Sequence, residues 1–447
     1  MPPIDLHGKR ATVMGLGRFG GGLGAARYLA SQGAQVLVTD LSPPEKLAEP
    51  LAEIEPLVKA GRITTRLGEH RAEDFTNTDL IVANPAVPHP WDNPYLLAAK
   101  TAGVPITTEI QLQIERLPSR DHIIGITGSV GKSTTTAMIA HALRGAGHAV
   151  LLGGNIGGSL LEREVPADAW VVLELSSFML HWLGTAPQPW SPAVAVCTNI
   201  APNHLDWHGS MEHYTASKQH LVRHQHSGDR AVLGPTLADW ASLTPARCTV
   251  ISEPVTASLT VPGAHNRLNA AVAIETAIAT DPSLDRQQLL ASLLSFPGLE
   301  HRLALCHRSS AGPQARLFFN DSKCTTPEAT LTAVASLAEA SGSPAHIHLI
   351  AGGYDKKADL TPISRLAQGL AGLYCIGDTG PAIAEAAGNA PAVHRCGTLD
   401  AAVRSAIDRM RPGDVLLLSP GCASWDQFIN YEHRGDAFVR LVKDLAR

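Results

Sequence analysis

The sequence of 447 residues has few aromatic side chains (5%) and no apolar run near the ~18 residues that a membrane-spanning helix needs. Its seven cysteines are scattered and none has CxxC spacing, which disfavours a zinc site or a disulfide framework and favours a reducing compartment. A formal net charge of −5 gives no basic footprint for nucleic acid. The first residues lack an apolar stretch after a basic start, so we expect no signal peptide and a cytoplasmic location.

Hydrophobic residues make up 45% of the chain, which is ample for buried cores, and the length suggests about three domains of roughly 150 residues. Short β-branched runs alternate with segments of helical periodicity, a pattern typical of doubly wound α/β sheets. We expect a Rossmann-like domain over residues 1–118, a P-loop ATPase-like domain over 119–298 and a second Rossmann-like domain over 299–447.

The most informative stretch is 122–136, which reads HIIGITGSVGKSTTT. It predicts a buried strand, a glycine-rich turn and a helix that begins at Lys132-Ser133. Backbone N–H groups and the helix dipole of such a turn face a phosphate, while the lysine reaches the β/γ-phosphates and the serine ligates Mg²⁺. The strict P-loop pattern requires glycine at Ile126, but Gly128 still relieves the middle of the loop. The stretch predicts a nucleoside triphosphate site.

A second glycine-rich turn lies near the amino terminus. A short strand over 11–14 enters the run Gly15–Gly20, and a later strand over 35–39 ends at Asp40. This setting is typical of a dinucleotide-binding turn, although it does not require NAD, and a Rossmann-like sector that binds nothing is the alternative. A strand over 80–83 ends at Asn84, which we expect to open onto the same crevice.

Polar residues also follow the predicted strands of the middle sector. Glu174 ends a buried strand, where a P-loop protein places a Mg²⁺ ligand. His204 follows another strand, and we rank it above the neighbouring histidines, most of which we expect at solvated helix positions. From the residues alone, Lys218 at the end of the Tyr214–Lys218 turn is a surface lysine.

Nine segments, in this order, resemble the Mur ligases: GITGSVGKSTTT, GGNIG, ELSSF, NHLDWHGSMEHYTASK, PGAHNRLN, GLEHR, NDSKCTTPEAT, GGYDKK and SPGCASWDQF. Within the family, two of the last segments and the Rossmann-like first sector resemble the members that add D-glutamate. The resemblance implies ATP-dependent amide-bond formation through an acyl phosphate, with UDP-N-acetylmuramoyl-L-alanine (UDP-MurNAc-L-Ala) and D-Glu as substrates in peptidoglycan precursor synthesis.

The resemblance also implies roles for individual residues. The ATP-binding candidates are Gly128, Gly131, Lys132, Ser133, Thr134, Asn266, Asn269, Arg302 and Asp321. The candidate ligands of two Mg²⁺ ions are Ser133, Glu174, His204 and a carbamylated Lys218. The UDP-substrate candidates are Gly17, Arg18, Phe19, Asp40, Asn84 and Asn155. The glutamate-binding candidates are Lys323, Thr325, Lys356, Ser424 and Tyr431. The catalytic candidates are Lys132, His204, Lys218 and Lys323.

The sequence departs from the family pattern at several positions. Met179 replaces the glutamine that usually follows ELSSF, Val130 replaces an asparagine in the P-loop, and Tyr431 replaces a phenylalanine. The spacing from His204 to Lys218 is also one residue shorter than in some relatives. These changes leave the charged chemistry intact and alter local hydrogen bonding.

Three other functions remain open at this point. The first is a Mur ligase for another amino acid, such as L-glutamate, or a folylpolyglutamate synthetase. The second is an NAD-dependent dehydrogenase built on the first glycine-rich turn, and the third is a nucleotide-binding regulator without catalysis. We expect a monomer that acts on small molecules and binds neither nucleic acid nor membrane.

Overall fold

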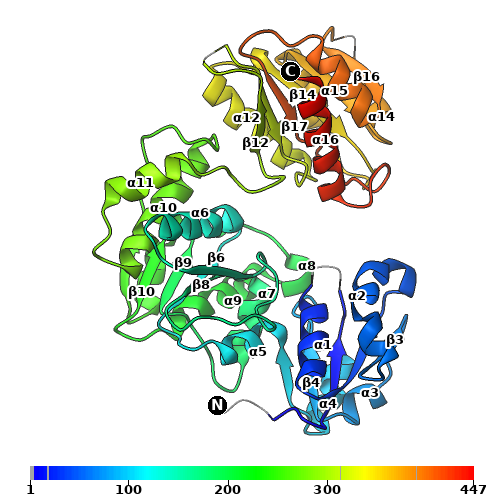
Figure 1. Ribbon diagram of the computed structural model, residues 1–447, viewed down its shortest axis with the longest axis vertical. Helices are drawn as coiled ribbons and strands as arrows, with labels where there is room; N and C mark the ends of the chain where they lie inside the picture. The colour runs from blue at the N-terminus through cyan, green and yellow to red at the C-terminus, as the bar shows by residue number, and fades with distance from the viewer. Residues whose placement is uncertain (1–4, 18–19, 313, 389, 447) are drawn as a thin grey trace. The chain divides into compact units, whose positions relative to one another are not determined.

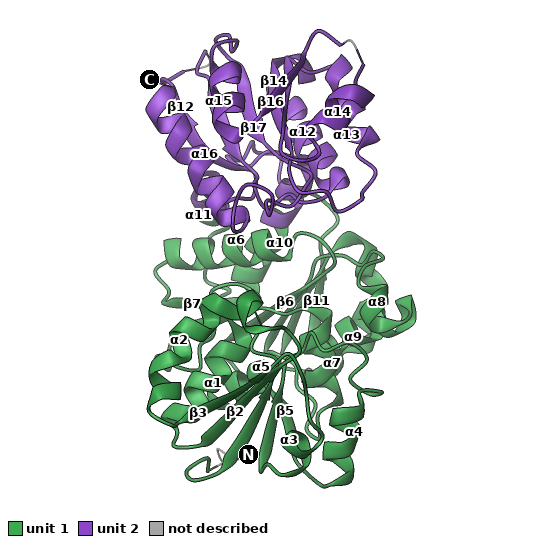
Figure 2. Cartoon of the chain, turned by 90° about the vertical axis from the view of Figure 1, so that its right-hand side faces the viewer, with its two compact units in different colours: residues 1–253, 271–289 green, residues 254–270, 290–447 purple. Residues whose placement is uncertain are grey.

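The computed structural model describes residues 5–17, 20–312, 314–388 and 390–446. These residues contain three β-sheets with helices around them (Figure 1). The chain forms two compact units: residues 1–253 and 271–289 make unit 1, and residues 254–270 and 290–447 make unit 2 (Figure 2). The expected α/β architecture in three parts is confirmed. Within the described ranges, no helix combines the length and apolarity needed to cross a bilayer.

The first sheet of unit 1 is parallel and has the strand order β3-β2-β1-β4-β5. Its strands are β1 (Arg10–Met14), β2 (Gln35–Asp40), β3 (Ile63–Leu67), β4 (Leu80–Ala83) and β5 (Ile106–Thr108). The helices of this part are α1 (Gly21–Ser31), α2 (Ala48–Lys59), α3 (Glu73–Thr76), α4 (Pro94–Thr101) and α5 (Glu109–Arg116). The strand order changes direction at β1 and β4, so their carboxyl ends flank a crevice where ligands bind in open sheets.

The second sheet of unit 1 is also parallel, in the order β11-β10-β9-β6-β8-β7. Its strands are β6 (Ile123–Thr127), β7 (Val150–Gly154), β8 (Trp170–Glu174), β9 (Val194–Cys197), β10 (Arg230–Leu233) and β11 (Arg247–Val250). The helices between them are α6 (Lys132–Gly145), α7 (Ser177–Thr185), α8 (Leu205–His208) and α9 (Met211–Arg223). Strands β6, β8 and β9 are buried along their whole length, as their apolar sequences predict.

The third sheet has the order β12-β13-β17-β14-β15-β16, and only its edge strand β12 runs antiparallel. Its strands are β12 (Ala304–Arg308), β13 (Leu317–Asn320), β14 (Ile347–Gly352), β15 (Gly372–Ile376), β16 (Val393–Gly397) and β17 (Val415–Leu418). The helices are α12 (Pro327–Ser341), α13 (Thr361–Arg365), α14 (Gly380–Ala386), α15 (Leu399–Ile407) and α16 (Tyr431–Leu445). Two apolar clusters, one on each face of this sheet, form the core of unit 2.

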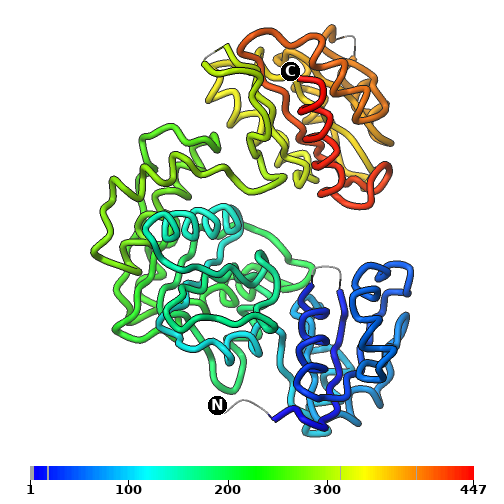
Figure 3. The backbone as a smooth tube through the Cα atoms, in the orientation of Figure 1, coloured from blue at the N-terminus to red at the C-terminus, as the bar shows by residue number. Residues whose placement is uncertain are grey.

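Two further helices, α10 (Ala264–Thr280) and α11 (Arg286–Leu294), lie where the chain passes between the units. The backbone can be followed through this stretch in Figure 3. The division between the units falls inside both helices, after residue 270 and after residue 289. The domain boundaries expected at 118/119 and 298/299 therefore stay a prediction.

Candidate functional site

The glycine-rich loop between β6 and α6 has a backbone conformation that favours glycine at two positions. Gly128 and Gly131 have φ angles of 154° and 83°, and a Cβ atom at Gly128 would lie 1.9 Å from Thr198 Oγ1. Thr198 donates a hydrogen bond to the Val130 carbonyl (2.8 Å), and Asn199 Oδ1 accepts one from the Val130 N–H (2.9 Å). The loop is therefore held in shape by the segment that follows β9.

The helix that follows this loop supplies the groups of a phosphate site. Lys132 begins α6, and its Nζ donates to the carbonyl oxygens of Gly128 (3.0 Å) and Ser129 (3.2 Å). Ser133 and Thr134 stand in the first helical turn, where backbone N–H groups lack helical partners and attract anions. The geometry is that of a cradle for phosphate groups.

Glu174 is the last residue of β8 and lies directly opposite Ile126 of β6. Ile126 comes two residues before Gly128 of the glycine-rich loop. Its side chain is buried, with 3% of its surface exposed. Within the described part of the chain, its Oε2 atom has no hydrogen-bond partner. Hydroxyl and carboxylate oxygens are the ligands that Mg²⁺ prefers, so Ser133 and this unpaired oxygen fit a magnesium ion.

Lys218 lies in the middle of α9 and is 2% exposed, so the expectation of a surface lysine is wrong. Its Nζ donates to Thr127 Oγ1 (3.2 Å) and to the Gly128 carbonyl (2.8 Å), which places it at the base of the phosphate loop. Burial, followed by repulsion from Lys132, lowers its pKa to about 7. A lysine in this state has a substantial neutral fraction near physiological pH.

His204 precedes α8 and has a φ angle of 53°, an uncommon value for a residue other than glycine. Its ring lies 4.9 Å from the ring of Phe178. Desolvation, followed by the charge of Lys132, lowers its pKa, and Lys218 acts in the same direction. The structure therefore brings His204, Lys132 and Lys218 within electrostatic reach of one another.

The neighbouring histidines are less solvated than expected, because one is buried and three are half-buried. They are His208, His213, His220, His224 and His226, and only the last is exposed. His208 is buried, and its ring nitrogens lie 3.0 Å from His213 Nδ1 and 2.9 Å from Ser177 Oγ. The ring of Trp91 packs against His213 at 4.6 Å. Sequence spacing missed this packing because Trp91 comes from a loop far away in the chain.

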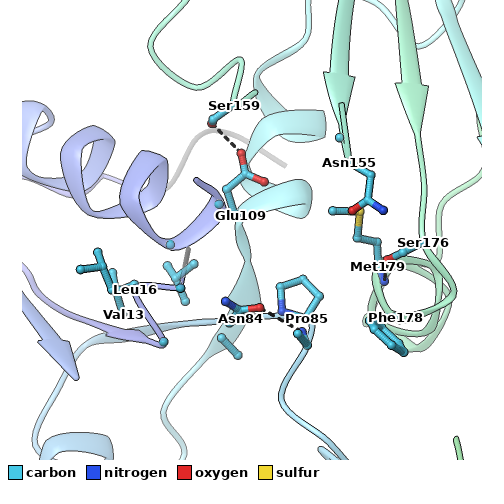
Figure 4. Close-up of a pocket in the computed structure, with 18 of the residues that line it drawn as sticks. Val13, Leu16, Asn84, Pro85, Glu109, Asn155, Ser159, Ser176, Phe178 and Met179 are labelled. Atoms are coloured by element: carbon cyan, nitrogen blue, oxygen red, sulfur yellow. Dashed lines mark hydrogen bonds between the residues drawn. The ribbon is translucent and has the colours of Figure 1, made fainter. Parts of the chain in front are cut away.

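A separate pocket of about 170 Å³ lies in unit 1 and brings together several UDP-substrate candidates. Gly17, Asn84 and Asn155 line it, as does Met179. Figure 4 shows the Asn155 and Met179 side chains next to each other, opposite Asn84. The pocket is bordered by the glycine-rich turn after β1, the end of β4 and the turn after β7, as expected for strand ends that open onto one crevice.

The other UDP-substrate candidates are placed differently. Asp40 is not among the residues that line the pocket. Its carboxylate accepts hydrogen bonds from the backbone N–H groups of Gly17 (3.2 Å) and Ser42 (2.7 Å). It holds the turn in place. Arg18 and Phe19 lie outside the described residues.

Glu109 also lines this pocket, and sequence reasoning did not find it. It is buried at the first turn of α5, and its carboxylate accepts a hydrogen bond of 2.6 Å from Ser159 Oγ. Burial raises its pKa. The contact joins two segments that are 50 residues apart, which no local pattern could indicate.

In unit 2, Asp321 follows β13 and accepts hydrogen bonds from the Leu303 N–H (3.0 Å) and from Ser419 Oγ (2.8 Å). Desolvation raises its pKa from the ordinary value of 3.8 to about 7, because the two hydrogen bonds do not offset the lost hydration. An acidic group in this state changes its charge near neutral pH. Such a shift is common at functional sites.

The raised pKa makes a prediction about stability. Between about pH 4 and about pH 7 the folded chain holds a proton on Asp321 that the unfolded chain has released. The neutral carboxyl therefore stabilises the folded state at low pH, and this contribution to the free energy of unfolding is lost as the pH rises through that window. We expect Asp321→Asn to raise the unfolding temperature by about 2–4 °C at pH 7 and above, and by less near pH 4. Thermal unfolding of both proteins across this range measures the difference. An equal difference at every pH would contradict the assignment.

The glutamate-binding candidates cluster after β13, β14 and β17. The Nζ atom of Lys323 lies 5.0 Å from the centroid of the Tyr431 ring, and Thr325 is half-buried two residues beyond Lys323. Ser424 is buried in the segment after β17. The carboxyl ends of adjacent parallel strands thus carry a cation, hydroxyl groups and an aromatic ring at one edge of the third sheet.

Two adjacent lysines in the segment after β14 differ in their surroundings. Lys357 forms an ion pair with Asp355, with 2.6 Å between Nζ and Oδ2. Lys356 has no ion pair within the described ranges, and its Nζ lies 5.0 Å from the centroid of the Trp425 ring. This difference supports Lys356, rather than Lys357, as a cation for a substrate carboxylate.

The remaining ATP-binding candidates also lie in unit 2. Asn269 Nδ2 donates to Asn266 Oδ1 (3.2 Å), which confirms that the two asparagines share a helix face. Asn266 Nδ2 in turn donates to the Pro262 carbonyl (2.7 Å). Arg302 is exposed in the turn before β12.

Arg434 is a positioning residue that sequence reasoning missed. It is 1% exposed, in α16, and donates to the carbonyl oxygens of Ser322, Cys422 and Ala423. Its Nε also donates to Ser322 Oγ (3.0 Å). The guanidinium thereby fixes the segments after β13 and β17, which carry the glutamate-binding candidates.

Comparisons with known proteins cover the chain in three parts. Residues 9–108 match the model "Mur ligase MurD-like, N-terminal domain", residues 126–253 match "Mur ligase middle domain", and residues 301–422 match "Mur ligase, glutamate ligase domain". The chain is 34% identical to the UDP-N-acetylmuramoylalanine–D-glutamate ligase of Koribacter versatilis (99% of each chain covered). It is 36% identical to that of a Roseiflexus species (98% of this chain, 99% of the relative).

A solved structure shows the same fold. The UDP-N-acetylmuramate-alanine ligase MurC of Thermotoga maritima superposes with a TM-score of 0.58 over 98% of this chain and 99% of its own. The sequence identity is only 19%, so this likeness concerns the architecture alone.

Proposed function

Because the chain belongs to the Mur ligase family, we propose that it joins D-glutamate to UDP-N-acetylmuramoyl-L-alanine at the expense of ATP. The observation that carries the proposal is the identity of more than a third with a ligase of this name over essentially the whole of both chains. The phosphate loop and the cationic strand ends provide the chemistry that the reaction needs. The reaction belongs to peptidoglycan precursor synthesis, and we place it in the cytoplasm with the chain acting as a monomer.

The reaction requires an unreactive carboxylate to become an electrophile. A carboxylate oxygen of the acceptor attacks the γ-phosphorus of ATP, ADP leaves, and an acyl phosphate forms. The amine of glutamate then attacks the acyl carbon, and inorganic phosphate leaves from the tetrahedral intermediate. Anions must meet in both steps, so catalysis depends on positioned positive charge.

Residues of unit 1 supply the triphosphate site. The N-terminal N–H groups of α6 and the ammonium of Lys132 bind the phosphates, and the Gly128–Gly131 loop lets the backbone approach them. Ser133 and the unpaired carboxylate oxygen of Glu174 would hold Mg²⁺, and His204 would hold a second ion. Bound Mg²⁺ would neutralise charge on the phosphates during transfer.

Residues of unit 2 are the candidates for amino-acid binding and include further candidates for ATP binding. Lys323 and Lys356 provide two cations for the two carboxylates of glutamate, and Ser424 with Thr325 provides hydroxyl groups. Asn266, Asn269, Arg302 and Asp321 contribute to ATP binding.

The buried Lys218 is proposed to be carbamylated. Its neutral amine would attack carbon dioxide and lose a proton, which converts a cation into a carboxylate-bearing anion next to the phosphate loop. We expect native mass spectrometry of active protein to show the added mass of one carbon dioxide, and Lys218→Met to lack it. Active protein with an unmodified Lys218 would contradict this proposal.

The activity itself is tested by phosphate release from ATP. Purified protein with Mg²⁺ is supplied with UDP-MurNAc-L-Ala and with D-glutamate, L-glutamate or other amino acids in parallel. The proposal predicts release that requires both the nucleotide substrate and D-glutamate. Release with a different amino acid, or with none of the combinations, would overturn it.

A further inference from the structure

Two large aromatic side chains are exposed beside the glutamate-binding candidates of unit 2. Trp425, in the segment after β17, is 56% exposed, and Tyr354, in the segment after β14, is 40% exposed. Their rings lie 5.5 Å apart with a tilt of 59°. Large exposed aromatic rings carry a cost in water, so the pair calls for an explanation.

The Trp425 ring lies next to the ammonium group of Lys356. The Lys356 ammonium lies 5.0 Å from the ring centroid, within the distance at which the ring's quadrupole attracts a cation. The neighbouring Lys357 is instead neutralised by Asp355. Trp425 therefore holds the one lysine of the pair whose charge is not neutralised by a carboxylate in the described residues.

The backbone just before Trp425 is held by contacts with two neighbouring segments. The Tyr354 N–H donates to the Ala423 carbonyl (2.9 Å), which ties the two segments together. A Cβ atom at Gly353 would lie 2.3 Å from the same carbonyl oxygen, so this close approach requires glycine. Arg434 holds the other side through the Cys422 and Ala423 carbonyl oxygens.

We propose that Trp425 is a positioning residue that holds the Lys356 ammonium ready for the side-chain carboxylate of glutamate. This inference rests on the proposed function. A lysine side chain loses considerable rotamer freedom when it is fixed by a ligand. The Trp425 ring restricts that freedom before the ligand arrives, so glutamate binds more tightly without the ring touching any reacting atom.

The test compares steady-state kinetics of the wild type, Trp425→Leu, Trp425→Phe, Lys356→Met and the double variant Trp425→Leu/Lys356→Met. We expect Trp425→Leu to raise KM for D-glutamate about two- to fivefold, the factor that corresponds to ~0.5–1 kcal/mol, with little change in kcat. Trp425→Phe keeps an aromatic face and should stay closer to the wild type. In the Lys356→Met background, Trp425→Leu should have no further effect.

The outcomes separate this inference from the proposed function. A wild type that releases no phosphate with D-glutamate overturns the function. An active wild type with an unchanged KM in Trp425→Leu overturns the inference, and so does an equal rise in KM when Lys356 is already methionine. Ile429→Ala is the control, because Ile429 lies on the same segment, is 75% exposed and has no assigned role. A similar rise in KM in that variant would also overturn the inference.

Discussion

Replacing Lys132 by alanine is expected to lower kcat/KM for ATP by about 10²–10³-fold, or ~3–4 kcal/mol. Its ammonium lies against the Gly128 and Ser129 carbonyl oxygens, at the mouth of the phosphate loop. Charge that develops on the transferring phosphoryl group would lose a positioned cation. The measurement is phosphate release at varied ATP concentration, with thermal unfolding to show that the variant is folded.

The matched control for this substitution is Lys59→Ala. Lys59 is a surface lysine whose side chain is 71% exposed and, among the described residues, forms an ion pair with Glu55 one helical turn away. It should leave the kinetics unchanged, since an exposed pair contributes little. Near-normal turnover in Lys132→Ala would contradict a role of the phosphate loop in catalysis.

Glu174→Gln is expected to have the second largest effect, a fall in kcat/KM of about 10²-fold. The substitution keeps the shape of the side chain and removes the negative charge of the buried, unpaired oxygen that fits Mg²⁺. Because a ligand that binds only the folded state raises its stability, Mg²⁺ with ATP should raise the unfolding temperature of the wild type. The variant should lose the part of this rise that depends on Mg²⁺.

Glu55→Gln, on the exposed face of α2, serves as the control for charge removal alone. It should behave as the wild type in both measurements. A full Mg²⁺-dependent rise in the unfolding temperature of Glu174→Gln would show that this carboxylate is not a ligand.

The sequence was sufficient for the parts of the fold that follow from local pattern. The strand over 80–83 has the expected bounds, because short apolar runs bounded by polar turns belong to buried parallel strands. The phosphate loop could likewise be located from its glycines, lysine and serine, since the chemistry lies in consecutive residues.

Long-range contacts could not be predicted in this way. Lys218 has the sequence context of a surface lysine, and its burial depends on Thr127 and Gly128, which are about 90 residues away in the chain. The contact of Glu109 with Ser159 and the contacts of Arg434 with Ser322 are of the same kind. In each case the partner is far away in the chain, and only the folded structure brings the two together.

Asp40 shows a different limit of the pattern. An acidic residue at the end of the second strand indicates a ribose ligand in dinucleotide-binding folds. Here both carboxylate oxygens of Asp40 accept hydrogen bonds from backbone N–H groups. One N–H belongs to the glycine-rich turn and the other to the loop after β2. The pattern located the residue correctly, but the structure supports a role in holding the turn.

The central claim is that ATP activates the acceptor carboxylate as an acyl phosphate before glutamate captures it. The most direct measurement uses UDP-MurNAc-L-Ala labelled with ¹⁸O in its terminal carboxylate, turned over with ATP, Mg²⁺ and D-glutamate. The account predicts that each inorganic phosphate released carries one labelled oxygen, because that oxygen leaves with the phosphoryl group. Unlabelled phosphate formed together with the amide product would contradict it.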